Sequence, residues 1–290
     1  MPIKSFSFST VLDGTSLQDA IDALAFDGIV VIEDAIDFEH LRILRERCLQ
    51  DVELLLNRPD KPFNWNPGNL QQDPPPFPPY LFRDVLVNDA VIKVTKGILG
   101  PGLKSAFYSG NTALPSPHRQ PVHADSGQLW PNLTVAHPAY AIVVNVPLVD
   151  MSAENGVTEM WPGTHLDTSV VMQTGDIKVS AEVLEARAKV EPPVQPTVKL
   201  GSIVLRDIRM WHAGMPNHSD SPRPMIAMIH FVSWWPTSTL KFPVGTESIF
   251  KHPDLVTHAE FTEEAIDYIS APGAYEYISA SAEVQAQGAV

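Results

Sequence analysis

The feature that most constrains the fold is a change of residue pattern at Ser105. Downstream of it, segments rich in β-branched and aromatic residues are separated by turn signals such as Asn155-Gly156 and Pro162-Gly163. Upstream of it, helical periodicity dominates. Helices first and strands later, without regular alternation, predict an α+β chain whose core is an antiparallel β-sandwich or barrel. The predicted later strands cover residues 105–111, 140–146, 197–205 and 225–234.

The helical segments carry start and stop signals. Ser16 is a good N-cap for a helix that Gly28 ends, and Asp37 caps the next helix. Cys48 falls on the apolar stripe of that second helix, which predicts a small core residue rather than a reactive thiol. The predicted helices cover residues 16–26, 37–55, 84–99, 180–190 and 262–270, with a short buried strand at 29–32 and a frayed tail from residue 279.

Composition and charge narrow the possible functions. The 290 residues, 44% of them hydrophobic, suffice for one large domain over 1–290 with a real core. The net charge of −14 argues against nucleic acid and anionic membranes as partners. A single cysteine excludes an internal disulfide and a thiolate metal cluster, and it fits a reducing compartment. Because residues 1–10 lack a secretory signal and no segment is long and apolar enough to span a membrane, we expect a soluble cytoplasmic protein.

Residues 57–80 form a proline-rich loop. Eight prolines make regular secondary structure improbable there. The aromatic residues Phe63, Trp65, Phe77 and Tyr80 argue for packing against the body of the protein. Two interpretations stay open, a connecting loop and a lid over a pocket, since long ordered loops are often functional.

The motif that carries chemistry is His123-Ala124-Asp125. On an extended strand, side chains two apart point to the same face, so one segment presents an imidazole beside a carboxylate. With a second histidine, these ligands suit Fe(II) or Mn(II) in a facial triad with open positions. His212, 87 residues after Asp125 and just beyond a predicted strand, is the best candidate. Arg223, 11 residues later at the start of the next strand, is placed to grip a carboxylate in the same barrel.

The specificity of this pattern comes from the complete set. A His-x-Asp tripeptide alone is weak and occurs by chance in many proteins. His165 follows Pro162-Gly163-Thr164 and is interpreted as part of a structural turn. Six further histidines lack a carboxylate at a useful spacing and are interpreted as surface or packing residues: His118, His137, His218, His230, His252 and His258.

Two more motifs complete a resemblance. They are the turn Asn155-Gly156-Val157-Thr158, followed by 161–165 (Trp-Pro-Gly-Thr-His), and the opening strand at 27–34. With the His-x-Asp, His212 and Arg223, the chain resembles the phytanoyl-CoA dioxygenase (PhyH) family of Fe(II)/2-oxoglutarate enzymes over about residues 20–235. Within that family it is similar to fungal dioxygenases that tailor meroterpenoids and alkaloids.

The resemblance implies both a fold and a metal. The fold is a double-stranded β-helix of the jelly-roll or cupin-like kind, with helices buttressing one sheet. The metal is a catalytic Fe(II) held by His123, Asp125 and His212. Related halogenases carry a small residue in place of the carboxylate. Asp125 therefore points to hydroxylation, desaturation, rearrangement or endoperoxidation rather than to halogenation.

The resemblance also implies cosubstrates and their contacts. The cosubstrates are 2-oxoglutarate, which would chelate the iron, and O2. Arg223 would pair with the far carboxylate of 2-oxoglutarate, and Gln120 and Thr158 would fix its orientation. Four further residues are candidates for the substrate pocket: Tyr108, Asn111, Met160 and Trp211.

The leading hypothesis is an Fe(II)/2-oxoglutarate-dependent dioxygenase that oxidises a mid-sized, mostly apolar natural product in secondary metabolism. No basic cluster is present to bind the phosphates of an acyl-CoA. One alternative is a non-catalytic, metal-binding partner subunit with the same fold. Another is a β-sandwich binding or isomerase module that uses Zn(II) or Mn(II) without 2-oxoglutarate. A homodimer is a further possibility. In it, the proline-rich loop and a C-terminal extension from about residue 240 would cover the pocket of the neighbouring subunit.

Overall fold

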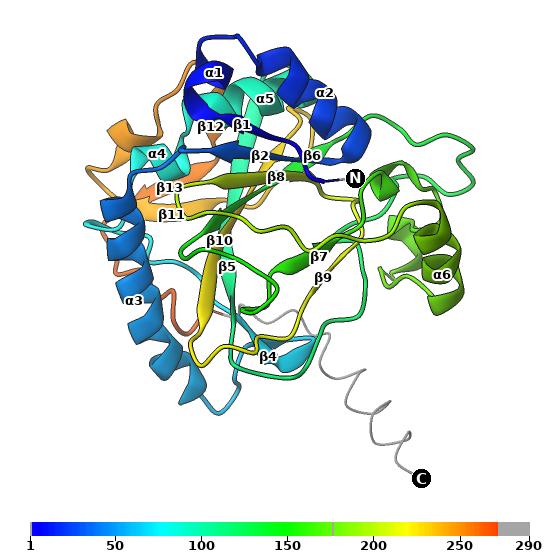
Figure 1. Ribbon diagram of the computed structural model, residues 1–290. Coiled ribbons are helices and arrows are strands. Elements are labelled where there is room, and N and C mark those ends of the chain that lie inside the picture. Colours follow the sequence, from blue (N-terminus) through cyan, green and yellow to red (C-terminus); the bar gives the residue numbers. More distant parts are fainter. Residues whose placement is uncertain (1, 176, 272–290) are drawn as a thin grey trace.

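A nine-stranded sheet forms the centre of the computed structural model, which describes residues 2–175 and 177–271 (Figure 1). Adjacent strands of this sheet run antiparallel, except that β1 is parallel to β2 and β12 is parallel to β5. The antiparallel core confirms the expected α+β class. In spatial order the strands are β1 (Ser5–Ser7), β2 (Ile29–Glu33), β8 (Ile203–Asp207), β6 (Ala141–Pro147), β10 (Arg223–Phe231), β5 (Leu103–Ala113), β4 (Asn66–Gln71) and β3 (Phe63–Asn64), with β12 (Leu255–Thr257) beside β5.

A small second sheet faces the first. It consists of β7 (Thr158–Met160) and antiparallel β9 (His212–Gly214). Met160 and Val157 pack there against Val204 of the main sheet in one apolar cluster. A separate parallel pair is formed by β11 (Leu240–Pro243) and β13 (Ala259–Thr262).

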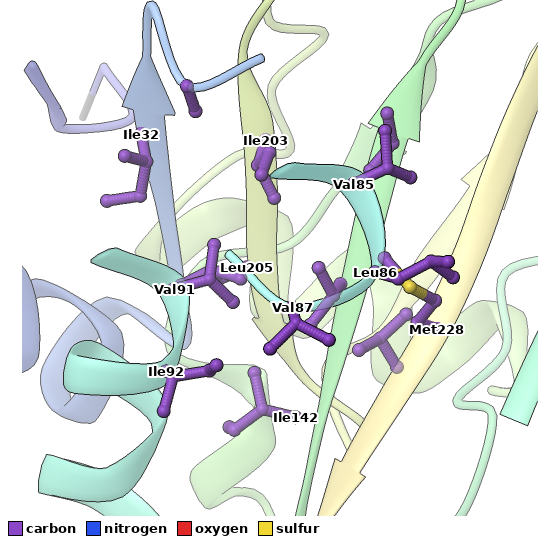
Figure 2. Packing of buried hydrophobic residues seen from close by; sticks show 14 of the residues in the cluster. Ile32, Val85, Leu86, Val87, Val91, Ile92, Ile142, Ile203, Leu205 and Met228 are labelled. Atoms are coloured by element: carbon purple, nitrogen blue, oxygen red, sulfur yellow. The ribbon is translucent and has the colours of Figure 1, made fainter. Parts of the chain in front are cut away.

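Helices cover the outer face of the main sheet. Successive side chains along each strand point alternately to this helix-covered face and to the opposite, inner face of the sheet. Figure 2 shows Ile142 of β6 and Leu205 of β8 packed with Val87, Val91 and Ile92 of the helical layer. Burying each such side chain contributes roughly 1.5–3 kcal/mol. The helices are α1 (Phe8–Leu12), α2 (Leu17–Asp27), α3 (Phe38–Leu56), α4 (Arg83–Leu86) and α5 (Asp89–Leu99), with α6 (Ala181–Val190) lying apart from them (Figure 1).

Several predicted elements form with shifted bounds. The helix expected over 84–99 is two helices, because the side chain of Asn88 caps the second by accepting from the amide of Val91 at 3.2 Å. The strand expected from residue 197 begins at 203. Gly201 precedes it with φ +90°, and a Cβ there would lie 2.5 Å from Phe38 Cε1, so the chain turns at this glycine.

Two predictions about secondary structure are wrong. The helix expected over 262–270 is absent, because residues 259–262 pair in β13 and 263–271 are irregular. Phe261 packs there in an aromatic cluster with Phe242 and Phe250, which favours the strand. The proline-rich loop is not wholly irregular, since β4 lies within it and pairs with β5. The tail expected to fray from residue 279 lies outside the described residues.

No helix in the described ranges combines the length and the apolar character that crossing a membrane requires. Cys48 is buried in α3, as predicted, with 3% of its surface exposed. Burial raises the pKa of its thiol to about 12. Cys48 is therefore a core residue that stays protonated at neutral pH.

Candidate metal centre

The two histidines predicted as ligands face each other across an antiparallel bridge. His123 N donates to His212 O at 3.0 Å, and His212 N donates to His123 O at 2.8 Å. Residues paired in this way project their side chains to the same side. The two ring centroids are 4.4 Å apart. His212 begins β9, whereas His123 lies in an isolated bridge rather than in the extended strand expected from the sequence.

Each histidine is oriented through its Nδ1 atom. His123 Nδ1 lies 2.8 Å from Pro121 O, and His212 Nδ1 lies 3.0 Å from Met210 O. A carbonyl oxygen only accepts, so these contacts assign the proton to Nδ1 and leave a lone pair on Nε2. Metal-binding histidines are commonly fixed in this manner.

The carboxylate of Asp125 meets the two free nitrogens. Its Oδ1 lies 3.9 Å from His123 Nε2 and 3.4 Å from His212 Nε2. The ligand atoms of the three residues all lie within 4.8 Å of one another. Two imidazole nitrogens and one carboxylate oxygen are the donor set of a facial triad, so the residues present fit Fe(II).

The charge states also suit a divalent cation. Burial, together with His212, lowers the pKa of His123 to about 3, so its ring is neutral at neutral pH. Burial works to raise the pKa of Asp125, but the charge of Arg206 and the nearby His212 outweigh it and hold that pKa well below the usual value. The side chain of Asp125 is nevertheless 35% exposed, because it projects into an open cavity.

Arg206 belongs to the site although no motif pointed to it. It lies on β8, with Leu205 on the core face and Arg206 on the inner face, and it is 5% exposed. Its Nη2 donates to Asp125 Oδ2, which leaves Oδ1 turned toward the histidines. The available signal was an arginine directly after the apolar run 203–205, where a strand buried on both faces is apolar throughout.

A buried ion pair shapes the turn that leads to His212. Arg209 Nε and Nη2 donate to the two oxygens of Asp207 at 2.9 and 2.7 Å. Trp211 N then donates to Thr164 Oγ1 at 3.0 Å, which ties the turn to the 161–165 motif. These contacts fix the backbone immediately before His212.

Arg223 is buried and has no acidic partner among the described residues. It is the first residue of β10 and is 3% exposed. Its Nη2 donates to Gly156 O at 2.7 Å, and its Nε donates to Asn155 O at 3.4 Å, so the predicted Asn-Gly turn supports it. Nη1 has no hydrogen-bond partner among the described residues, and burial lowers the pKa of the guanidinium to about 10. A buried cation of this kind favours an anionic ligand.

One cavity borders the triad and Arg223. It holds about 1150 Å³ of empty space, counted out to its open mouth. Residues 64–69 of the proline-rich loop form part of its wall, and the Trp65 ring lies 4.9 Å from that of His123. This segment therefore lines the pocket, as the lid interpretation expects. Residues near 77–80 pack elsewhere, with Phe77 against Tyr268.

The predicted cosubstrate residues lie at this cavity. Gln120, Thr158 and Arg223 all border it. Gln120 Oε1 accepts from Gly214 N at 2.7 Å, so one end of this amide ties down β9. Thr158 pairs with Gly214 across the small sheet.

Of the four predicted substrate-pocket residues, Asn111 alone borders the cavity. Tyr108 packs in the main core, which follows from alternation, because residues three apart on β5 cannot share a face. Met160 lies in the apolar cluster between the sheets. Trp211 points away from its neighbour His212 and packs near Trp161, 6.5 Å between ring centroids.

The other histidines are mostly held by packing. His165 is buried, and its Nε2 lies 3.0 Å from Ala25 O, which supports the structural interpretation. His230 is buried beside Thr95 of α5, with 3.0 Å between Nδ1 and Oγ1. His118, interpreted as a surface or packing residue, is exposed and also borders the cavity.

Comparison with known proteins shows to which family the chain belongs. Residues 25–225 match the family model described as phytanoyl-CoA dioxygenase (PhyH). The chain belongs to the phytanoyl-CoA dioxygenase family. A curated PhyH relative, Dioxygenase af480 of Aspergillus fumigatus, is 26% identical over 169 residues, which cover 57% of this chain and 49% of the relative. This PhyH chain therefore spans about half the length of that curated relative.

Solved structures share the fold of this PhyH chain. AviO1 from Streptomyces viridochromogenes gives a TM-score of 0.56 at 18% identity, covering 76% of this chain and 97% of AviO1. HygX from Streptomyces hygroscopicus, solved with nickel, 2-oxoglutarate and hygromycin B bound, gives 0.55 at 13% identity, with 84% and 97% covered. EctD from S. alaskensis, solved with 2-oxoglutarate and 5-hydroxyectoine, gives 0.54 at 18% identity, with 73% and 74% covered. These likenesses confirm the double-stranded β-helix expected for the PhyH family.

Proposed function

We propose that this chain is an Fe(II)- and 2-oxoglutarate-dependent oxygenase that oxidises a mid-sized organic metabolite. One observation carries the proposal: a single cavity brings together three converging side chains that could bind a metal and a buried arginine with no acidic partner among the described residues. His123, Asp125 and His212 would hold the iron, and Arg223 would hold the far carboxylate of 2-oxoglutarate. Bound iron and 2-oxoglutarate supply O2 activation and the oxidation of a C–H bond.

The protein's own residues supply orientation. Arg223 would fix the far carboxylate through Nη1, the donor left unused within the described structure. Gln120 uses Oε1 for Gly214 N, so its amide N–H groups remain as donors toward 2-oxoglutarate. Thr158 borders the same space with a hydroxyl. Asp125 fills the third ligand position with a carboxylate, which favours oxygenation, desaturation, rearrangement or endoperoxidation over halogenation.

The cavity is open to solvent at its mouth, so a small molecule can reach the space beside the triad. HygX holds 2-oxoglutarate and hygromycin B together, which supports a small-molecule substrate and a role in secondary metabolism. The wall of the cavity is richer in amides than the mostly apolar substrate expected from the sequence would need.

The test is an anaerobic titration of the Fe(II)-loaded protein. We expect 2-oxoglutarate to produce a visible charge-transfer band. The matched control is 2-oxobutyrate, which has the same chelating end but no far carboxylate to pair with Arg223. Losing one charged hydrogen bond of about 1.5–3 kcal/mol predicts roughly 10- to 150-fold weaker binding of the control. No band with 2-oxoglutarate, or equal affinities for the two acids, contradicts the proposal.

A second candidate function is a non-catalytic, metal-binding partner subunit with the same fold. The complete triad and the unpaired Arg223 favour the oxygenase, because a partner subunit needs no cosubstrate site. Succinate formation from 2-oxoglutarate without added substrate separates the two. An oxygenase turns over slowly under these conditions, whereas a non-catalytic subunit binds 2-oxoglutarate without producing succinate.

A further inference from the structure

β4 carries amides where a strand covered on both faces would carry apolar residues. Leu70 packs into the core against α3, whereas Asn69 and Gln71 on either side of it border the cavity. Both amides are buried, at 8% and 6% exposure. Asn111 lies opposite Gln71 on β5, and Asn64 lies on β3. We call Asn64, Asn69, Gln71 and Asn111 the amide wall.

A hydrogen-bond chain orients part of this wall. The hydroxyl of Ser109 donates to Asp73, and Gln71 Nε2 donates to Ser109 Oγ at 2.8 Å. Asn64 Nδ2 in turn donates to Gln71 Oε1 at 3.2 Å. Because the chain ends on a carboxylate, which accepts, each amide has a fixed direction. The carbonyl oxygen of Asn64 is therefore left as an acceptor.

Three atoms of the amide wall have no hydrogen-bond partner among the described residues. They are the acceptors Asn64 Oδ1 and Asn111 Oδ1 and the donor Asn69 Nδ2. Buried polar atoms normally find partners, so unmet ones gathered at a cavity point to a ligand. The three side chains border the same cavity, so a molecule seated there contacts the wall to which the three unmet atoms belong.

The amide wall itself carries no charge. Apart from histidines, the charged residues that border the cavity within the described ranges are Asp125, Arg206 and Arg223. Arg206 neutralises Asp125 through Nη2, although its Nη1 has no partner among the described residues, and Arg223 is assigned to 2-oxoglutarate; neither arginine belongs to the amide wall. A substrate carboxylate, phosphate or ammonium group placed at the amide wall would lose its water without gaining an opposite charge. The wall therefore suits uncharged hydrogen-bonding groups.

We propose, on the basis of the proposed function, that the amide wall binds an uncharged substrate through its hydroxyl or amide N–H groups. At least two donors of the substrate meet Asn64 Oδ1 and Asn111 Oδ1, and one acceptor meets Asn69 Nδ2. The preferred substrate is hydroxyl- or amide-bearing, in place of the mostly apolar molecule that the sequence suggested.

The test compares binding to the full chain loaded with Fe(II) and 2-oxoglutarate without oxygen. The probes are terpenoid polyols, neutral glycosides and small cyclic peptides, each paired with its fully O- or N-methylated derivative. Perturbation of the charge-transfer band and calorimetry report binding. We expect at least one parent compound to bind about tenfold or more tightly than its methylated partner, and the three groups of probes distinguish hydroxyl from amide donors. Equal or tighter binding of the methylated partners, or binding by no parent compound, overturns the inference.

Variants test the amide wall without a known substrate. Asn111→Leu and Asn69→Leu replace amides whose side chains make no hydrogen bond that the described structure shows. If these amides bind a ligand and do not stabilise the fold, each variant keeps or raises the melting temperature of the ligand-free protein. The affinity for the best parent compound falls about tenfold. Gln18→Leu, an amide replacement on the exposed surface of α2, is the control and leaves affinity unchanged. A drop of several degrees for both wall variants assigns them to the fold and overturns the inference.

The two proposals fail differently. Without a charge-transfer band from 2-oxoglutarate, the proposed function itself fails. With a normal band but a preference for methylated or charged probes, the oxygenase stands and the amide wall is not its substrate site.

Discussion

The two faces of the main sheet are built from the same strands but differ in kind. On the helix-covered face, Ile142, Leu205 and Ile226 are 0–2% exposed within one continuous apolar core. On the inner face, Arg206 of β8 and Asn145 of β6 border the cavity, with polar groups at positions just as deeply buried. On the first face buried positions carry apolar residues, as expected, whereas on the second face buried positions carry polar and charged residues. Departures of this kind are typical of functional sites.

This contrast assigns different tasks to adjacent residues. Side chains at consecutive positions of one strand point to opposite faces. The helix face stabilises the sheet, which in turn fixes the positions of Arg206 and Arg223 on the inner face. Substitutions on the two faces should therefore separate stability from ligand binding.

The largest expected effect comes from His123→Ala on the inner side. Removing a metal ligand should weaken Fe(II) binding and succinate formation by more than about 100-fold, beyond the 10- to 100-fold typical of residues behind the ligands. Thermal unfolding of the metal-free protein should change little, because the ring serves the metal. His218→Ala, an exposed histidine, is the control. Retained 2-oxoglutarate turnover in His123→Ala would remove this residue from the triad.

The next prediction contrasts two neighbours on β6. Ile142→Ala opens a void in the core and should lower the free energy of unfolding by about 2–5 kcal/mol. Val143 borders the existing cavity, so Val143→Ala should lower the free energy of unfolding by only about 1–2 kcal/mol. This is close to the transfer free energy of the two lost methyl groups alone. Urea unfolding of both variants measures the difference. Equal losses would mean that the cavity is filled by protein in solution.

A third prediction uses pH on the helix face. Burial lowers the pKa of His230 to about 4, below the unfolded value of about 6.5. Between about pH 6.5 and 4 the unfolded chain binds a proton at His230 and the folded chain does not. The contribution of neutral His230 to the free energy of unfolding is therefore fully present above about pH 6.5 and is lost as the pH falls toward 4. The difference reaches about 3 kcal/mol. His230→Leu should therefore lose less stability than wild type between pH 6.5 and 4 when both are unfolded without metal. Parallel pH profiles would show that His230 accepts its proton in the folded state.

Arg223→Leu should separate ligand binding from stability. The variant loses a charge-assisted contact to the far carboxylate, so 2-oxoglutarate should bind about 10- to 100-fold more weakly. The fold should be unchanged or more stable, because a buried cation without an acidic partner is removed. The preference for 2-oxoglutarate over 2-oxobutyrate should disappear. Strong destabilisation instead would assign Arg223 to support of the Asn155-Gly156 turn.

Much of the fold was predictable because it rests on local signals. Caps, apolar stripes and β-branched runs located α2, α3 and most strands of the main sheet. The helix expected at 262–270 failed because pairing of β13 with β11 and aromatic packing around Phe261 override local propensity. β4 was missed because eight prolines masked a short strand that forms by pairing with β5 on one side and β3 on the other.

The site divides in the same way. The sequence motifs predicted His123, Asp125, His212 and Arg223 as one site, and the structure brings these four side chains to one cavity. Asn111 was among the predicted pocket residues, whereas Arg206 and the other amides of the wall were not, since strand pairing is what brings them to one cavity. Tyr108 and Asn111 lie on opposite faces of β5, so Asn111 borders the cavity while Tyr108 packs in the core.

Arg206→Lys should have the smallest effect and tests the inner face most finely. Arg206 holds Asp125 Oδ2, so that Oδ1 faces both histidines. Lysine keeps the positive charge but loses the planar fork. Fe(II) binding should weaken about tenfold, the lower end of the effects seen for residues behind metal ligands. Arg42→Lys on the exposed surface of α3 is the control for the exchange itself. Unchanged Fe(II) affinity would mean that charge alone, rather than the geometry of the guanidinium, positions Asp125.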